Sequence, residues 1–198
     1  MKLVFATNNQ HKLDEVRKVV TDDIQIISLS DINCYDDIPE TAETLEGNAL
    51  QKVHYIKEHF GYDCFADDTG LEVEALNNAP GVLSARYGSI NGEHTDPKKN
   101  NERIIKELTG VSNRFAKFVT AMYYYDGTNL ISSIGELCGE ITTEPRGTKS
   151  FGYSSIFEIP EYKMTLAEID DELRYAINHR GNASRLLIKQ LKDYMVKK

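Results

Sequence analysis

The first twenty residues of the chain contain a short apolar run, a polar turn and a helical pattern in direct succession. Residues 3–6 are continuously apolar, which is typical of a strand buried on both faces of a sheet. Leu13, Val16, Val19 and Val20 then recur at helical spacing. A strand that leads directly into a helix favours an α/β fold, and ligands bind at such junctions in α/β sheets.

The polar turn at residues 7–12 lies at this junction. The free N–H groups at the start of a helix attract anions. Lys12 places a cation in the first helical turn, where the helix dipole favours acidic residues. This placement indicates a lysine kept for an anionic ligand, and a solvated lysine beside a capping asparagine is an equally good interpretation of the turn alone.

Two adjacent carboxylates, Asp67 and Asp68, follow a second apolar run at residues 64–66. Such neighbours repel each other, so they are stable together where a cation or hydrogen bonds compensate their charge. Mg²⁺ takes oxygen ligands from one or two carboxylates together with substrate phosphates. The pattern predicts a buried strand that ends at a charged site. An Asp-rich turn is the alternative, because Asp-Asp-Thr-Gly is also good turn chemistry.

The length of 198 residues fits one domain over residues 1–198, with room for a sizeable core. Residues 115–125 and 130–141 read as two strands joined at Asp126-Gly127, an antiparallel hairpin that either extends the sheet or forms a second lobe. Thr165 and Glu168 have the spacing of a capping box, which predicts that a helix begins there.

Composition excludes several classes of protein. The formal net charge of −8 argues against nucleic acid as a partner, because phosphate-backbone binding needs a basic surface. The three cysteines form no C-x-x-C pair, which favours a reducing compartment. No stretch approaches the roughly 20 apolar residues of a membrane span, so we expect a cytoplasmic protein with no membrane partner.

Residues of both charges are available for a metal-bound polyphosphate, which needs carboxylates for the metal and cations for the phosphate oxygens. The candidate oxygen ligands are Glu40, Asp67 and Asp68, and the candidate phosphate-binding residues are Lys12, Lys52, Lys149, Arg174, His179 and Arg180. The sequence contains neither a P-loop nor a dinucleotide-binding motif, and no Ser or Cys nucleophile signature. Metal-assisted attack of water on a nucleotide phosphate is therefore the leading reaction class.

A series of motifs along almost the whole chain resembles the inosine triphosphate pyrophosphatase family, which hydrolyses non-canonical purine nucleoside triphosphates to the monophosphate and pyrophosphate. The motifs are Thr7-Asn8-Asn9 with Lys12 and Glu15; Glu40 with Asn48-Ala49 and Lys52; residues 66–71; residues 80–81 with 84–87; residues 151–153; Thr165 with Ala167-Glu168; and residues 179–181. The resemblance implies an elongated α/β protein with a central mixed sheet flanked by helices, two lobes with an active-site cleft between them, and a homodimer.

The resemblance also implies roles for individual residues. Asp68 would act as general base or metal ligand toward the attacking water, with Glu40 and Asp67 helping to hold Mg²⁺. The residues implied for the triphosphate are Thr7, Asn8, Asn9, Gln10, His11, Lys12, Lys52, Arg174, His179 and Arg180, and Thr69 is also expected to bind substrate. Those implied for the base are Phe151, Gly152, Tyr153 and Ser154 with His179 and Arg180. Donors that read a 6-oxo group would favour ITP, dITP and XTP over adenosine nucleotides.

The chain departs from the family pattern in its base-recognition loop. It has Ser154-Ser155 where the family normally has Asp-Pro, which removes a carboxylate and a rigid turn. Arg174 also stands where a lysine is usual. Two other functions stay open from the sequence: a catalytically silent purine-nucleotide-binding protein, and a metal-dependent phosphatase acting on another phosphorylated metabolite.

Overall fold

The computed structural model describes residues 1–20, 23–89 and 96–196. The chain divides into two compact units. The first unit comprises Met1–Asp68, Thr120–Gly135 and His179–Lys198, and the second comprises Thr69–Val119 and Glu136–Asn178. Among the described residues, no helix is both long and apolar enough to cross a membrane.

The described residues form an α/β protein with a mixed eight-stranded sheet, as predicted. The strands are β1 (Lys2–Phe5), β2 (Gln25–Ile27), β3 (Cys64–Val73), β4 (Ala79–Pro80), β5 (Phe115–Tyr125), β6 (Leu130–Ile141), β7 (Phe157–Ile159) and β8 (Met164–Thr165). Their order is β2-β1-β3-β5-β6-β7-β8, with β4 paired to β3. β1 is parallel to β2 and β3, while the β3–β4, β6–β7 and β7–β8 pairs are antiparallel.

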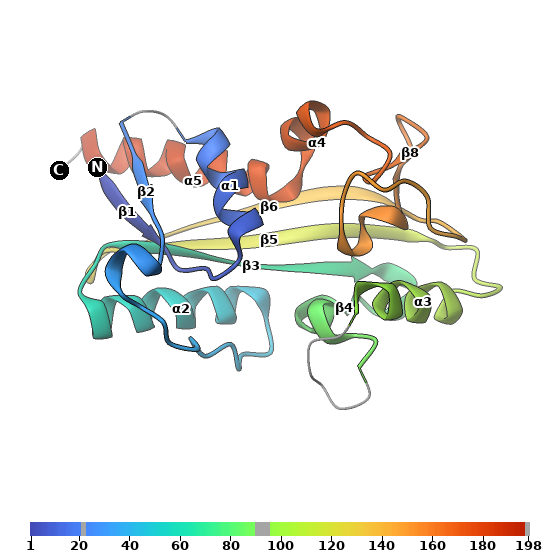
Figure 1. The fold of residues 1–198 in the computed structure, drawn as a ribbon, viewed down its shortest axis with the longest axis horizontal. Helices are drawn as coiled ribbons and strands as arrows, with labels where there is room; N and C mark the ends of the chain where they lie inside the picture. The colour runs from blue at the N-terminus through green and yellow to red at the C-terminus, as the bar shows by residue number, and fades with distance from the viewer. Residues whose placement is uncertain (21–22, 90–95, 197–198) are drawn as a thin grey trace. The chain divides into compact units, whose positions relative to one another are not determined.

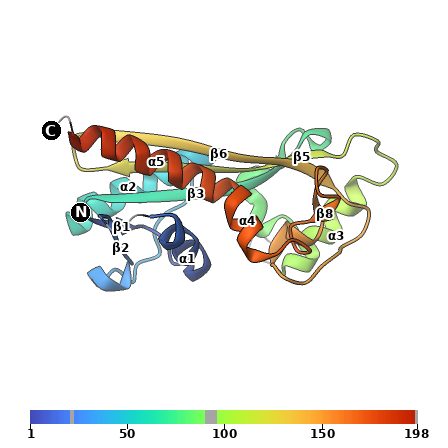
Figure 2. The ribbon, with the colours of Figure 1, turned by 90° about the horizontal axis from the view of Figure 1, so that it is seen from above.

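Five α-helices are present in the described part of the chain: α1 (Gln10–Val19), α2 (Leu45–Phe60), α3 (Pro97–Glu107), α4 (Asp171–Ile177) and α5 (His179–Val196). Short 3-10 helices are η1 (Ser30–Ile32), η2 (Glu74–Leu76), η3 (Gly81–Arg86) and η4 (Gly152–Ser155). The predicted hairpin is confirmed as β5 and β6, which run side by side (Figure 2). Each of these two strands contributes residues to both units.

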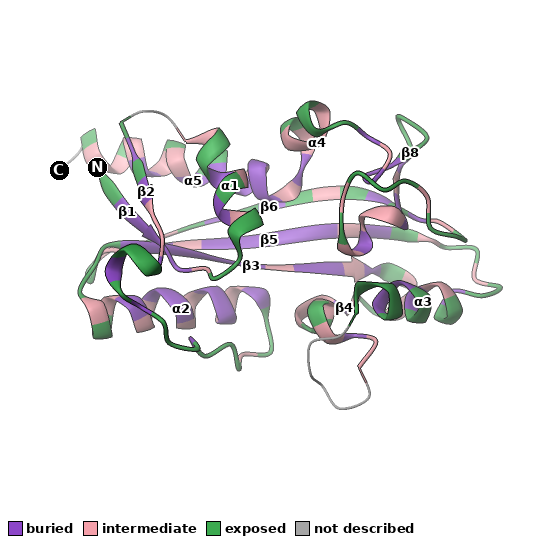
Figure 3. Ribbon diagram, in the orientation of Figure 1, coloured by how far each residue is buried: buried purple, intermediate pink, exposed green. Residues whose placement is uncertain are grey.

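The sheet of the first unit carries helices on both faces. Leu3 and Phe5 of β1 belong to an apolar cluster with residues of α1 and α5, whereas Val4 and the following Ala6 pack with residues of α2. Successive side chains of a strand point to opposite faces. Accordingly, α1 and α5 cover one face and α2 the other (Figure 1). Part of α2 is buried (Figure 3), and its buried residues include two polar ones, Asn48 and Lys52.

The same alternation along β3 separates the two neighbouring carboxylates. Phe65 packs with residues of α1 and α5, and Ala66 packs with residues of α2. Asp67 therefore faces α1 and α5, and Asp68 faces α2. The prediction that the strand ends at this pair, and the alternative of an Asp-rich turn, are both wrong, because β3 continues to Val73. The strand tolerates the charges because each carboxylate has its own partners, described below.

The second unit has one apolar core, to which α3 and β7 both contribute buried side chains. Ile104, Leu108 and Phe157 are fully buried there, and the rings of Phe118 and Phe157 lie 4.7 Å apart between centroids. The predicted helix start at Thr165 is wrong. The Thr165 hydroxyl donates to the Arg146 carbonyl instead of capping a helix, and α4 begins at Asp171 with Asp170 as its N-cap.

Candidate active site

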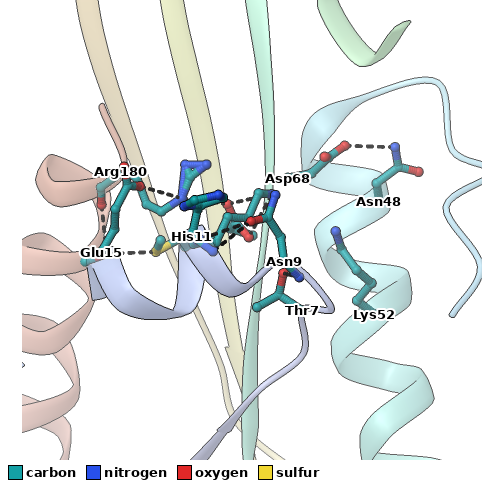
Figure 4. Close-up of polar contacts among 12 residues, drawn as sticks. Thr7, Asn9, His11, Glu15, Asn48, Lys52, Asp68 and Arg180 are labelled. Carbon is teal, nitrogen blue, oxygen red and sulfur yellow. Dashed lines mark hydrogen bonds and ion pairs between the residues drawn. The ribbon is translucent and has the colours of Figure 1, made fainter. Parts of the chain in front are cut away.

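The turn between β1 and α1 is held by its own side chains. The Thr7 hydroxyl accepts a hydrogen bond from the backbone N–H of Asn9 at 3.1 Å. The Asn9 side chain caps α1 by accepting from the backbone N–H groups of His11 and Lys12, at 3.0 and 3.3 Å (Figure 4). These bonds fix the helix N-terminus, whose dipole favours an anionic ligand.

Asp67 lies at the centre of a buried cluster of charges. Its carboxylate is fully buried, 3.0 Å from the Lys12 ammonium and 3.5 Å from the Arg180 guanidinium. Arg180 also lies 3.3 Å from Glu15, so this ion pair joins the first turn of α5 to α1 (Figure 4). Asp67 thus holds two phosphate-binding candidates at one place in the first unit.

The protonation of this cluster follows from burial and charge. Burial by itself raises the pKa of Asp67, but the nearby charges of Lys12, Arg180 and Lys52 outweigh it and hold that pKa well below its usual range. Burial lowers the pKa of Lys12, while Asp67 opposes that change. Asp67 is consequently an anion at neutral pH, and its charge compensates the cations gathered around it.

Asp68 has a different environment on the other face of the strand. One of its carboxylate oxygens accepts a hydrogen bond of 2.9 Å from the Asn48 side-chain amide, as Figure 4 shows. The Asn48 oxygen accepts in turn from the backbone N–H of Ala42, also at 2.9 Å. Burial raises the pKa of Asp68, and Lys52 and the Asn48 hydrogen bond oppose that rise. A carboxylate with a raised pKa is a stronger base, as general-base catalysis requires.

Glu40 and Lys52 form an ion pair beside Asn48. The Lys52 ammonium lies 3.1 Å from Glu40, with the lysine side chain 6% exposed and the glutamate side chain 48% exposed. The neighbouring Thr41 is held to α2 by two hydrogen bonds of 2.9 Å with the Gln51 side chain. The segment that carries Glu40 is therefore attached to the same helix that positions Asp68.

His179 begins α5 and precedes Arg180. Burial lowers the pKa of the His179 ring well below its usual value, and the Arg180 charge adds to this, while Asp67 opposes it. The imidazole is therefore neutral at pH 7, with one ring nitrogen able to donate a hydrogen bond and the other able to accept one.

Seven other predicted residues belong to the second unit: Thr69, Lys149, Phe151, Gly152, Tyr153, Ser154 and Arg174. Phe151 is 60% exposed, whereas Tyr153 is buried and its hydroxyl donates to the Ser84 carbonyl at 2.7 Å. Arg174 makes local contacts, donating to the Ile169 carbonyl at 3.2 Å and to Asp171 at 2.5 Å. The structure thus presents Phe151 at the surface and uses the Tyr153 side chain within the fold.

A family model described as the Ham1 family matches residues 3–190. The chain belongs to the Ham1 family. A dITP/XTP pyrophosphatase of Flavobacterium johnsoniae is 46% identical over 192 residues, covering 96% of this chain and 98% of that protein. A dITP/XTP pyrophosphatase of Porphyromonas gingivalis is 43% identical over 197 residues, covering 98% of this chain and 97% of that protein. These relatives confirm the family resemblance drawn from the sequence.

Solved structures agree with this assignment. The Ham1 protein of Staphylococcus aureus has a TM-score of 0.88 at 32% identity, covering 98% of this chain and all of that one. The nucleoside-triphosphatase / dITP/XTP pyrophosphatase of Mycobacterium abscessus has a TM-score of 0.78 at 36% identity, covering 95% of this chain and 99% of that one. The Ham1 fold therefore extends over nearly the whole length of the chain.

The carboxylates of this Ham1 protein fit a magnesium ion that is shared with a substrate. Within the described residues, no group of three or more His, Cys, Asp or Glu side chains gathers that could hold a metal alone. Mg²⁺ commonly takes only one or two carboxylates and completes its shell with substrate phosphates and water. Asp68 and Glu40 fit that pattern, because both lie beside α2, whereas the charge of Asp67 is already compensated by two cations.

Two residues of this site were not predicted from the sequence. Asn48 positions Asp68, and Glu15 pairs with Arg180. Both belong to motifs that carry the family resemblance, and the spacing of Asn48 and Lys52 places them on one side of a helix. The signal available for Asn48 was its place beside Leu45 and Ala49 on the apolar side of the predicted helix, because an amide buried there needs a partner.

Proposed function

We propose that this Ham1 protein is a Mg²⁺-dependent nucleoside triphosphate pyrophosphatase that hydrolyses ITP, dITP and XTP to the nucleoside monophosphate and pyrophosphate. One observation carries the proposal: Asp68 is held by Asn48 on one face of β3, while Lys12 and Arg180 gather around Asp67 on the other. A base and the cations for a polyphosphate thus come together in one unit. The activity of the full-length relatives supports the same substrate class.

The reaction needs a water molecule and a base. Water attacks a phosphorus atom of the triphosphate, the bond between the α- and β-phosphoryl groups breaks, and Asp68 accepts a proton from the water. Asn48 keeps the Asp68 carboxylate in place for this transfer. Lys12, Lys52 and Arg180 neutralise charge on the phosphate oxygens.

Asp68 and Glu40 would hold Mg²⁺, which stabilises negative charge on the phosphoryl oxygens when it is bound. The two ion pairs of Asp67 favour a counter-ion role for this residue over the metal-ligand role predicted from the sequence. The Thr7–Lys12 turn would bind phosphate through the backbone N–H groups at the start of α1. Thr69 and Arg174 stay predictions as substrate-binding residues.

The purine would stack on the Phe151 ring, because this residue is 60% exposed. Hydrogen-bond donors near the base would favour a purine with a 6-oxo group and disfavour one with a 6-amino group. His179 and Arg180 stay predictions as base-binding residues. A cleft between two lobes, a homodimer and a cytoplasmic location stay predictions of the resemblance.

A turnover assay on dITP, XTP, dGTP and dATP with Mg²⁺, resolving pyrophosphate from orthophosphate, tests this function. We expect pyrophosphate, with strong preference for dITP and XTP, and no turnover after the metal is removed with a chelator. Orthophosphate as the product would indicate a phosphatase. Saturable binding without any product would indicate a silent nucleotide-binding protein.

A further inference from the structure

Asn101 is a polar residue on the buried side of α3. It is 6% exposed, and Ile104, one helical turn further along, is fully buried in the core of the second unit. An apolar residue is the default at such a position, because burying an amide costs free energy unless it is hydrogen-bonded. The contacts of Asn101 therefore indicate what it does.

The NH₂ group of Asn101 holds the loop that follows Phe151. It donates to the Gly152 carbonyl at 3.1 Å and to the Ser155 hydroxyl at 3.2 Å, which uses both of its hydrogens. The Asn101 side-chain oxygen is buried and has no hydrogen-bond partner among residues 1–20, 23–89 and 96–196. If the Asn101 amide were flipped, its oxygen would lie against the Gly152 carbonyl oxygen, and neither atom could donate a hydrogen bond. The amide is therefore oriented with its NH₂ group toward Gly152.

Other contacts hold the same loop within the second unit. The Tyr153 hydroxyl donates to the Ser84 carbonyl, and the hydroxyls of Ser150 and Ser154 lie 3.1 Å apart in a hydrogen bond. Gly152 has φ +64°, a left-handed conformation that favours glycine directly after the exposed Phe151. The backbone that follows Phe151 is thus fixed, while Phe151 itself is 60% exposed.

We propose that Asn101 is a positioning residue for purine binding: through the Gly152 carbonyl and the Ser155 hydroxyl it sets the Phe151 ring in place for stacking on the base. This inference rests on the proposed function. Ser155 is also required for this positioning, because a residue without a side-chain hydroxyl at position 155 could not accept the hydrogen bond from Asn101. Ser154 and Ser155 stand where the family pattern has Asp-Pro. In this chain the hydrogen bonds of the two serines hold the loop in place of a rigid proline turn.

The adjacent Asn100 offers a matched control on the same helix. It is 5% exposed, and its side chain binds the backbone of the segment before α3, accepting from Gly88 N–H at 2.5 Å and donating to the Ser84 carbonyl at 3.3 Å. Replacing Asn100 also removes two hydrogen bonds of a buried amide, but neither of them reaches Gly152 or Ser155, and its one link to the loop is indirect, through the Ser84 carbonyl that Tyr153 also binds.

The test compares Asn101→Asp, Ser155→Ala and Asn100→Ala with the wild-type chain. Asn101→Asp keeps the shape of the side chain but loses both donors, and Ser155→Ala removes one bond only. Two readouts are needed: the KM for dITP, and the Ki of inorganic tripolyphosphate, a probe without a base, measured against dITP hydrolysis. Thermal unfolding of each variant reports whether the fold is retained.

We expect Asn101→Asp to raise the KM for dITP about tenfold or more, and Ser155→Ala to raise it by about two- to fivefold. The tripolyphosphate Ki should stay within about twofold of wild type, because the phosphate-binding residues are untouched. Asn100→Ala should lower the unfolding temperature without this rise in KM.

Several results would overturn the inference. An unchanged KM in Asn101→Asp, an equal rise in the tripolyphosphate Ki, or an equal KM rise in Asn100→Ala would each show that Asn101 serves the fold alone. If Asn101→Asp does not fold, an unchanged KM in Ser155→Ala would overturn the inference in its place. A wild-type chain that does not hydrolyse dITP would instead contradict the proposed function.

Discussion

Asp67 and Asp68 are neighbours in β3, yet their carboxylates have different partners on opposite faces of the strand. Asp67 pairs with Lys12 and Arg180, and Asp68 accepts a hydrogen bond from Asn48. The alternation of the strand separates the two charges, so their repulsion is relieved without a shared metal. It also gives the two carboxylates opposite pKa shifts, downward for Asp67 and upward for Asp68.

Asp68→Asn should remove the base and leave the fold intact, because the Asn side-chain oxygen can still accept the hydrogen bond from Asn48. We expect kcat/KM for dITP to fall by about 10²- to 10⁴-fold. Steady-state kinetics and thermal unfolding measure the two effects, with Asp37→Asn, at an exposed position, as the control. Near-wild-type turnover of Asp68→Asn would refute the assignment of the base.

Asp67→Asn should mainly weaken the fold, since it removes the counter-ion of Lys12 and one of the two carboxylates that pair with the buried Arg180. Breaking a buried ion pair in this way costs about 3–5 kcal/mol in the free energy of unfolding. Urea unfolding at pH 7 measures this loss. The control is Asp63→Asn, which breaks an exposed pair with Lys57 of 2.8 Å and should cost less than about 1 kcal/mol. Equal losses in the two variants would contradict the counter-ion role.

Local patterns in the sequence were enough to predict the first strand and helix and the hairpin. Apolar runs and helical spacing depend on near neighbours, so they can be read directly. The pairing of Asp67 with Arg180 joins residues far apart in the chain, and no local pattern contains it.

The failed predictions have the same cause. Asp-Asp-Thr-Gly has the composition of a turn, and only its partners on α1, α2 and α5 explain why it lies within a strand. Thr165 has the spacing of a helix cap, but its hydroxyl donates a hydrogen bond to the distant Arg146 carbonyl. Tertiary contacts decide both cases. The role of Asn101 could not be predicted either, because its partners lie in a loop about fifty residues later.

Glu40→Gln should weaken the response to Mg²⁺, because it removes one of the two carboxylates that we assign to the metal. We expect the Mg²⁺ concentration for half-maximal turnover of dITP to rise about 10- to 100-fold, a range typical of lost metal-site interactions. Titration of Mg²⁺ at saturating dITP measures it. Glu43→Gln, at an exposed position in the same segment, should leave the titration unchanged. A midpoint for Glu40→Gln that matches wild type would exclude Glu40 as a metal ligand.

Asp126→Ala should destabilise the β5–β6 hairpin in a pH-dependent way. The Asp126 carboxylate accepts hydrogen bonds from the backbone N–H groups of Thr128 and Asn129, at 2.9 and 2.7 Å, and from the Tyr194 hydroxyl at 3.0 Å. Burial raises the pKa of Asp126, but these hydrogen bonds outweigh it and hold that pKa well below its usual range. The stabilisation belongs to the ionised carboxylate, so it is complete above the ordinary Asp pKa of about 4 and declines as the pH falls below it.

At pH 7 we therefore expect Asp126→Ala to lower the free energy of unfolding by about 1–3 kcal/mol. The difference from wild type should narrow at pH 3, where the unfolded chain takes up a proton that the folded chain resists. Urea unfolding at both pH values measures this, with Asp193→Ala, at an exposed position of α5, as the control that should change little at either pH. An equal loss for Asp126→Ala at pH 7 and pH 3 would mean that the turn depends on the shape of the side chain and not on its charge.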